Sequence, residues 1–164
     1  TKFGNNNSYC QDNEISWIYW SLLKNNKELF EFFKFMIAYR KKHPVIRKKL
    51  DNAVCGMEGM HAHDVNADRM EVSQNAKTLA VSFAGYDRKK GKDDLVYVAV
   101  NAYWEEVRIT LPNLANHGAW YLSVDTYGDE NGKYCYEEGE EIRIDHEYVI
   151  KPRSIVVFTG RDVF

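Results

Sequence analysis

The sequence predicts a mostly β-stranded protein: an antiparallel β-sandwich of about seven or eight strands, preceded by an α-helical N-terminal appendage. Two features of the 164-residue chain lead to this prediction. From Lys77 to Phe158, short apolar runs recur between turn-rich segments, several with a period of two, and no helical stretch separates them. Before Leu50, the spacing of the apolar residues is instead helical. We therefore expect two parts, residues 1–50 and residues 51–164, that meet near Leu50.

The first segment, residues 4–20, is polar in its first half and aromatic in its second. Gly4 and the three asparagines after it favour an irregular loop, because glycine and asparagine tolerate left-handed backbone and asparagine side chains bond to nearby backbone. The loop runs into Trp17 and Trp20. Amide groups and aromatic faces together suit a ligand that is rich in hydroxyl groups. The alternative, favoured on chemistry alone, is an ordinary polar loop held by two buried tryptophans.

A helix is predicted next, over residues 27–42, after a short helical turn or extended segment at 14–23. Asn25 and Glu28 have capping-box spacing, and Asn26 is the other residue that could open the helix. Cationic side chains fill the last turn, where the helix dipole favours them, and Pro44 stops the helix. The apolar stripe is wide, since it combines Leu29, Phe30, Phe32, Phe33, Phe35, Met36 and Ile37. This stripe must be covered by the sandwich or by a second copy of the chain, or remain an exposed patch.

The remaining elements are predicted strands. A basic linker or short helix at 45–50 leads into residues 51–75, which read as irregular chain with one or two short strands. The charged segment 87–94 predicts a hairpin loop. Segment 95–100 is apolar on both faces and is therefore expected in the centre of a sheet. The full set of predicted strands after residue 76 is 78–83, 95–100, 106–111, 120–124, 142–144, 148–150 and 154–158.

Composition excludes several function classes. The net charge of −2 provides no electrostatic footprint for nucleic acid or an anionic membrane, and no apolar run is long enough to span a bilayer. The three cysteines, Cys10, Cys55 and Cys135, show no CxxC spacing, so neither a disulfide framework nor a zinc site is indicated, and a cytoplasmic location is preferred. Because the chain starts at Thr1, we expect it to be a fragment. The alternative that the parent protein has a signal peptide upstream is left open.

Four segments carry a resemblance to a known family. Residues 4–17, GNNNSYCQDNEISW, closely resemble the segment after the last barrel strand in isoamylases and glycogen-debranching enzymes of the α-amylase superfamily, the branch that includes pullulanases. Segments 39–44 (YRKKHP), 101–105 (NAYWE) and 152–158 (PRSIVVF) are similar to segments of the same enzymes. The resemblance covers nearly the whole chain and is weakest over residues 51–74. It implies that residues 1–50 are the tail of a (β/α)₈ catalytic barrel, with a cleft loop and the last helix, and that residues 51–164 are the C-terminal sandwich.

The resemblance also implies a function. The intact enzyme would hydrolyse α-1,6-glucosidic linkages in glycogen, starch or a limit dextrin with a pair of carboxylates. The motifs that supply those carboxylates have no counterpart here, so we expect no catalytic residue, cofactor or metal in this chain, no hydrolysis by the chain alone, and a structural role in covering the barrel. The expected partners are the α-glucan, the enzyme's own barrel and a second copy of the fragment through the exposed helix. The loop implies these substrate contacts: Asn5, Asn6, Asn7, Tyr9, Gln11 and Asp12.

Three other groups of residues have side chains that could serve a catalytic, metal-binding or sugar-binding site. Asp12 and Glu14 are interpreted as loop partners rather than a catalytic pair, since two acids this close are common on any surface. His61, His63 and Asp64 could bind a metal, but no distant further ligand is identifiable, so solvated loop residues are favoured. A stand-alone carbohydrate-binding module would expose a row of aromatic side chains, although such residues more often belong to a core. The candidates for that row are Tyr103, Trp104, Trp120 and Tyr121.

Overall fold

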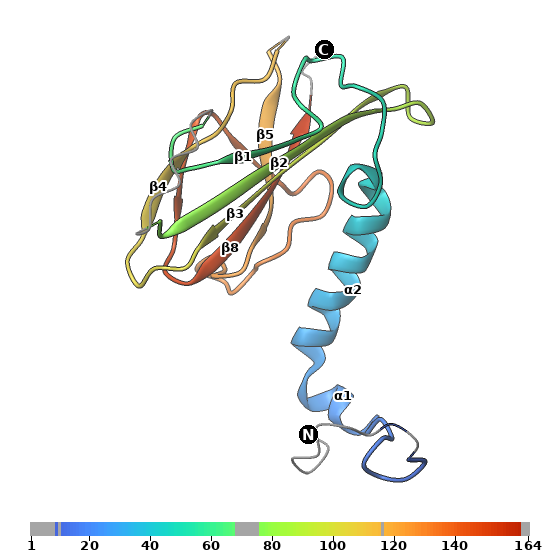
Figure 1. Cartoon of the computed structure of the whole chain (residues 1–164). Coiled ribbons are helices and arrows are strands. Elements are labelled where there is room, and N and C mark those ends of the chain that lie inside the picture. The colour runs from blue at the N-terminus through green and yellow to red at the C-terminus, as the bar shows by residue number, and fades with distance from the viewer. Residues whose placement is uncertain (1–8, 10, 68–75, 116, 162–164) are drawn as a thin grey trace. The chain divides into compact units, whose positions relative to one another are not determined.

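The computed structural model describes residues 9, 11–67, 76–115 and 117–161. It divides into two compact units, Thr1–Ile37 and Ala38–Phe164. Figure 1 shows the helices of the first unit and the strands of the second, with the chain coloured from its N-terminus to its C-terminus. None of the described helices is long and apolar enough to cross a membrane.

The first unit contains helix α1 (Leu22–Asn25) and the larger part of helix α2 (Lys27–Lys42), which has the predicted bounds. Asn25 is the last residue of α1, so the helix opens at Asn26 instead. The main-chain carbonyl of Asn26 accepts the first α2 hydrogen bond, from the amide of Phe30 at 3.0 Å. The side chain of Asn26 turns back and donates to the carbonyl of Leu22 at 2.9 Å.

The apolar stripe of α2 is largely exposed. Leu29, Phe33 and Ile37 each leave more than half of their surface accessible, and Phe30 nearly half. Helices of globular proteins normally bury such a stripe, so the described residues leave this one without its usual cover. Within the first unit the stripe forms an exposed patch, and its cover by the sandwich or by a second copy of the chain stays a prediction.

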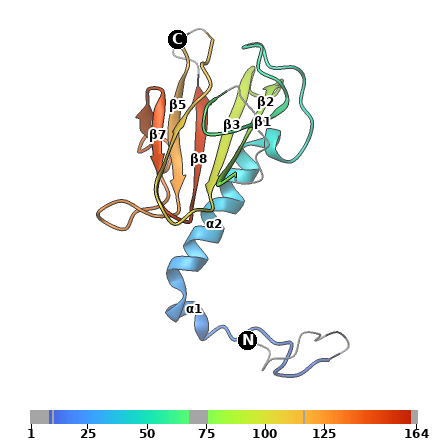
Figure 2. The same cartoon turned by 60° about the vertical axis from the view of Figure 1, so that its left-hand side comes forward.

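The second unit is a β-structure. Its described strands are β1 (Met60–His63), β2 (Thr78–Asp87), β3 (Lys92–Asn101), β4 (Val107–Thr110), β5 (Ala119–Asp125), β6 (Ile142–Ile144), β7 (Glu147–Ile150) and β8 (Ser154–Arg161). Six form one antiparallel sheet in the order β1-β2-β3-β8-β5-β6, and β4 pairs with β7 in a second sheet. Figure 2 shows β5, β8 and β3 running side by side. The predicted antiparallel sandwich is confirmed.

The core lies between the two sheets. Leu95 and Tyr97 from β3 and Phe158 from β8 are almost completely buried, and Ile109 of β4 and Ile150 of β7 join them from the smaller sheet. Strand β3 lies between β2 and β8, as its two apolar faces predicted. Close packing explains why β8 has a glycine at position 160. A Cβ on Gly160 would lie 2.8 Å from the Cβ of Leu95 and 3.1 Å from the ring of Trp120.

The hairpin between β2 and β3 differs from the prediction. The charged segment 87–94 was expected to be a loop, but β2 continues to Asp87 and β3 begins at Lys92. Two acidic residues belong to the strand because their carboxylates accept main-chain hydrogen bonds. Asp93 accepts from the amides of Val54 and Cys55, at 2.9 and 2.8 Å. A carboxylate that accepts two main-chain amide hydrogen bonds is accommodated at this position of the strand, and strand propensity alone does not foresee this.

The outer face of β3 and β8 holds the end of α2 through buried polar contacts. The Tyr39 hydroxyl lies 2.8 Å from Thr159 Oγ1, which in turn lies 2.8 Å from Ser123 Oγ on β5. His43 Nδ1 lies 2.6 Å from Asp94 Oδ1, and the rings of His43 and Tyr39 pack at 4.3 Å. Pro44 then opens the short 3₁₀ helix η2 (Pro44–Ile46), where a linker or short helix was predicted. We call Tyr39, His43, Asp94 and Thr159 the helix anchor.

We expect Asp94→Ala to lower the free energy of unfolding by about 2–5 kcal/mol, because it leaves the His43 ring and the amide of Val45 without their buried acceptor. Urea unfolding of the 164-residue chain measures this. The control is Arg108→Ala, which removes an exposed ion pair with Glu147 and should cost less than about 1 kcal/mol. Equal losses in the two variants would show that the anchor contributes nothing special.

The helix anchor also predicts a pH dependence. Burial raises the pKa of Tyr39 from 10.0 to about 12, so the folded protein holds this proton more tightly than the unfolded chain does. The resulting stability is fully present below about pH 10 and is lost as the pH rises towards 12. Tyr39→Phe should therefore flatten the decline of stability between pH 10 and 12, as measured by urea unfolding at several pH values. An unchanged slope would contradict this assignment.

Candidate functional site

The N-terminal loop is shaped by its own side chains. The Asn13 main-chain carbonyl accepts from the amides of Ser16 and Trp17, at 2.9 and 3.0 Å, and its side-chain oxygen accepts from the amide of Ile15 at 3.0 Å. Ser16 Oγ donates to the carbonyl of Gln11 at 2.6 Å. Asparagine and serine make such local bonds at turns, which is why this polar stretch forms a defined loop rather than a helix.

Acidic residues of the loop serve as local acceptors. Asp12 Oδ1 accepts from the indole nitrogen of Trp17 at 2.7 Å, and the main-chain carbonyl of Glu14 accepts from the Tyr19 hydroxyl at 2.9 Å. The interpretation of Asp12 as a loop partner is confirmed. Its carboxylate holds Trp17 in one orientation, although that ring remains 60% exposed.

The six substrate contacts implied by the resemblance divide into two groups. Asn5, Asn6 and Asn7 lie outside the described residues. The other three are described and are all accessible to some degree: Tyr9, Gln11 and Asp12. Tyr9 is 82% exposed, and Gln11 Oε1 accepts from the Asn13 side chain at 3.4 Å. These three side chains therefore remain candidates for contacting a ligand.

An open hollow of about 490 Å³ lies beside the loop within the first unit. Its walls are mainly aromatic and aliphatic, and the lining residues are Ile15, Ser16, Trp17, Ile18, Tyr19, Trp20, Leu22, Leu23, Asn26, Leu29, Phe30 and Phe33. Trp17 and Trp20 were expected to be buried if the loop were merely structural, yet both are mostly exposed. The hollow is continuous with the uncovered stripe of α2, so this unit presents one extended apolar surface.

The histidine segment is not a solvated loop. His61 and His63 lie on β1, and His63 is only 3% exposed, with Nε2 2.8 Å from Ser82 Oγ on β2. His61 Nδ1 lies 3.0 Å from Glu58. The expectation of two solvated histidines is wrong for His63, because its ring packs on Tyr97 in the interior, with 5.2 Å between the ring centroids. His61 lies on the same face of β1, 4.8 Å from the His63 ring, and is only half-buried. Among the described residues, no group of three or more His, Cys, Asp or Glu side chains could hold a metal ion.

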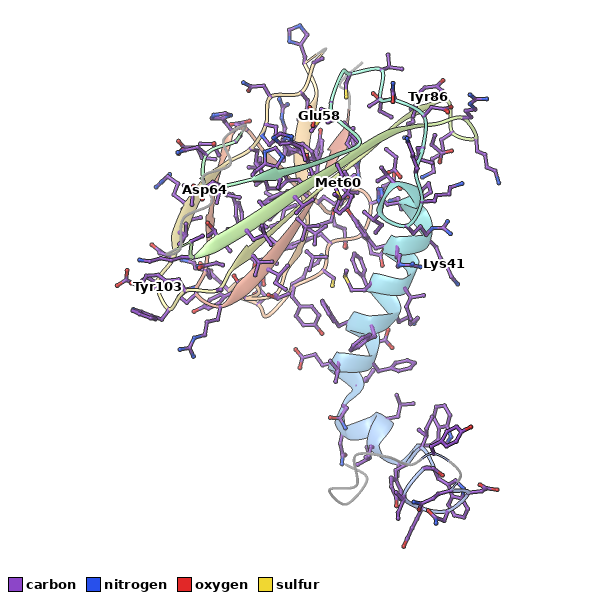
Figure 3. All side chains as sticks on the ribbon, viewed as in Figure 1. Lys41, Glu58, Met60, Asp64, Tyr86 and Tyr103 are labelled. Carbon is purple, nitrogen blue, oxygen red and sulfur yellow. The ribbon has the colours of Figure 1, made fainter. Side chains whose placement is uncertain are left out.

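The four aromatic candidates of the sandwich separate into core and surface. Trp120 is 2% exposed and its indole donates to the carbonyl of Pro112 at 2.7 Å, so it belongs to the core. Tyr121 is half-buried beneath the guanidinium of Arg161. Tyr103 and Trp104 lie on the loop between β3 and β4, where Trp104 is 66% exposed. Figure 3 shows Tyr103 at the end of the sheet. A row of four exposed rings is therefore not formed.

Sequence reasoning missed one member of this surface. The ammonium of Lys77 lies 3.7 Å from the centre of the Tyr103 ring, although the two residues are far apart in the chain. They meet because Lys77 immediately precedes β2 while Tyr103 follows β3, its antiparallel neighbour. The pairing of the two strands was predictable as a hairpin, but the contact depends on their register, which periodicity alone does not provide.

Comparison with known proteins identifies the larger part of the chain. The family model described as "Isoamylase, C-terminal" matches residues 48–159. An isoamylase of a Flavobacterium species is 30% identical over an alignment that covers 98% of this chain and 22% of that protein. Isoamylase 3 from rice, a chloroplastic protein, is 29% identical over 77% of this chain and 15% of its own length.

A third relative is similar over a shorter stretch. The glycogen operon protein GlgX homologue of Mycobacterium tuberculosis is 47% identical over 49 residues, which is 30% of this chain and 7% of the relative. The chain thus spans less than a quarter of the length of these relatives. Because the family model matches well over half of the chain, the chain belongs to the isoamylase C-terminal family.

Proposed function

We propose that this chain is the C-terminal part of a glycogen- or starch-debranching hydrolase that cleaves α-1,6-glucosidic linkages. The observation that carries the proposal is the isoamylase C-terminal match over residues 48–159. The alignment with the Flavobacterium isoamylase supports it further, because it extends over nearly the whole chain and so includes the N-terminal loop and α2.

We further propose that residues 1–50 are the tail of the catalytic barrel and residues 51–164 are the sandwich domain. The start of the family match at residue 48 supports a division near Leu50. The division by compactness falls earlier, after Ile37, because the last turn of α2 is held by the helix anchor on the sheet. On this proposal α2 belongs to the barrel tail, and Tyr39 and His43 near its end pack on the sandwich.

The chain's own role would be structural and supportive. The motifs that supply the carboxylates in the resembled enzymes have no counterpart in this sequence, and Asp12 accepts a hydrogen bond from Trp17. Instead, the first unit exposes an apolar hollow and the stripe of α2, a combined surface of the kind that marks an interaction site. In the intact enzyme the barrel would cover this surface. In the isolated chain, the same surface would promote self-association.

The loop would contribute substrate contacts to the intact enzyme. Tyr9 and Gln11 supply an exposed phenol and an amide, and Asp12 supplies a carboxylate, the groups that hydrogen-bond to sugar hydroxyls. Asn5, Asn6 and Asn7 are proposed on the resemblance. A cytoplasmic location is also proposed, because the three cysteines show no spacing of a disulfide framework.

The test compares the 164-residue chain with the longer protein that contains it. The chain alone should release no reducing sugar from glycogen or a β-limit dextrin, because it lacks the catalytic carboxylates. The longer protein should release it from both. Reducing sugar produced by the purified chain would overturn the assignment of a supporting role, and a longer protein that is inactive on both glucans would overturn the debranching function.

A matched variant tests the substrate loop. In the longer protein, Tyr9→Ala should raise KM for the branched glucan by about tenfold, equivalent to about 1.4 kcal/mol, because the exposed phenol is proposed to contact bound sugar. The control is Tyr127→Ala, which removes a comparably exposed phenol, 60% accessible, from the sandwich. Equal kinetic constants in the two variants would contradict a role of Tyr9 in substrate binding.

A further inference from the structure

An aromatic stack is built at one end of the sandwich, on the loop between β3 and β4. The rings of Tyr103 and Trp104 lie 4.1 Å apart and are tilted by 36°. The ammonium of Lys77 lies over the Tyr103 ring at 3.7 Å. Tyr103 is half-buried and thus forms the base of the stack, whereas Trp104 is its exposed member, with 66% of its surface accessible.

The loop that presents Trp104 is held rigidly by a buried asparagine. Asn101 is 1% exposed, and its side-chain nitrogen lies within hydrogen-bond distance of three carbonyls, those of Glu105, Ile150 and Lys151, at 2.8, 3.3 and 3.0 Å. Its side-chain oxygen accepts from the amide of Tyr103 at 2.9 Å. A fully satisfied buried amide of this kind fixes backbone geometry, so the exposed indole is held in place before any ligand arrives.

Hydrogen-bonding side chains are found next to the exposed ring of Trp104. In the part of the chain that the structure describes, the indole nitrogen of Trp104, the carboxylate of Glu105 and the guanidinium of Arg153 have no hydrogen-bond partner. Arg153 is adjacent in space, since its amide donates to the carbonyl of Tyr103 at 3.0 Å. Lys151 and Glu106 pair with one another at 2.8 Å on the same loop surface. Glu105 follows Trp104 in the chain and Arg153 contacts Tyr103 through its amide, so groups of both charges lie close to the stack.

We propose that Trp104 is the centre of a glucan-binding site on the sandwich, in which the indole covers one face of a glucose ring. This inference rests on the proposed function for its ligand class, an α-glucan chain. The Trp104 ring supplies the apolar face, and Glu105 and Arg153 supply an acceptor and donors for the hydroxyls at the edge of the sugar.

The surrounding charges favour a sugar over an apolar protein surface. A protein partner that covered Trp104 with aliphatic side chains would also bury Glu105 and Arg153 without partners, which is unfavourable for charged groups. A glucose unit has the opposite character. It offers an apolar face to the ring and hydroxyl groups at its rim, where the charged groups lie.

The experiment is isothermal titration of the 164-residue chain with maltoheptaose. The unchanged chain should bind it, and Trp104→Ala should weaken binding by about tenfold or more, the loss expected when a stacked aromatic face is removed. Trp104→Phe keeps a ring and should retain part of the affinity. The control is Met60→Ala, which removes an exposed apolar side chain, 69% accessible, from β1 and should leave this binding unchanged.

Three outcomes would overturn the site: no binding by the unchanged chain, equal affinity after Trp104→Ala, or the same loss of binding in Met60→Ala as in Trp104→Ala. Circular dichroism of each variant shows whether it is folded, and Trp104 is exposed enough for its removal to leave the core intact. The proposed function fails separately. If the longer protein does not debranch glucans while the chain still binds maltoheptaose through Trp104, the glucan site survives and the debranching assignment does not.

Discussion

The helix anchor is the contact on which the second unit depends most. Asp94 is on the central strand β3, yet its carboxylate reaches His43 and the amide of Val45 at the end of α2. Tyr39 makes a parallel connection to β8 through Thr159. Both connections are buried, so each polar group needs its hydrogen-bond partner. A different position of the helix end on the sheet would leave several of these polar groups without a partner. A purely apolar contact would not discriminate between positions in this way.

The regular elements were predictable where a single physical signal dominates. The bounds of α2 followed from strong helix formers, a cationic last turn and Pro44. The central position of β3 followed from its two apolar faces. The prediction of a loop failed where charged residues were taken to indicate a solvent-exposed segment. Asp93 and Asp94 were assigned to a loop, but long-range amide partners draw them into the strand, and no local pattern encodes such partners.

The candidate sites show the same division. The resemblance of residues 4–17 pointed to the isoamylases, and the family match bears that out, but the roles of individual loop residues remain predictions. Among the aromatic residues, sequence could not tell the buried Trp120 from the exposed Trp104, since each tryptophan has a tyrosine as its neighbour in the chain. The difference arises from Asn101, whose buried side chain turns the chain outward just before Trp104.

The larger sheet ends in two very short strands, β1 of four residues and β6 of three. On β6, the side chain of Arg143 is accessible. Glu141, which immediately precedes β6, forms an ion pair with Arg161 of β8. Little unpaired backbone is therefore offered for intermolecular sheet extension, and adding another chain's strand would bring charged side chains together. The edge strands of the larger sheet therefore disfavour fibrillar aggregation. Association of the isolated chain is more favourable through the exposed apolar surface of its N-terminal unit.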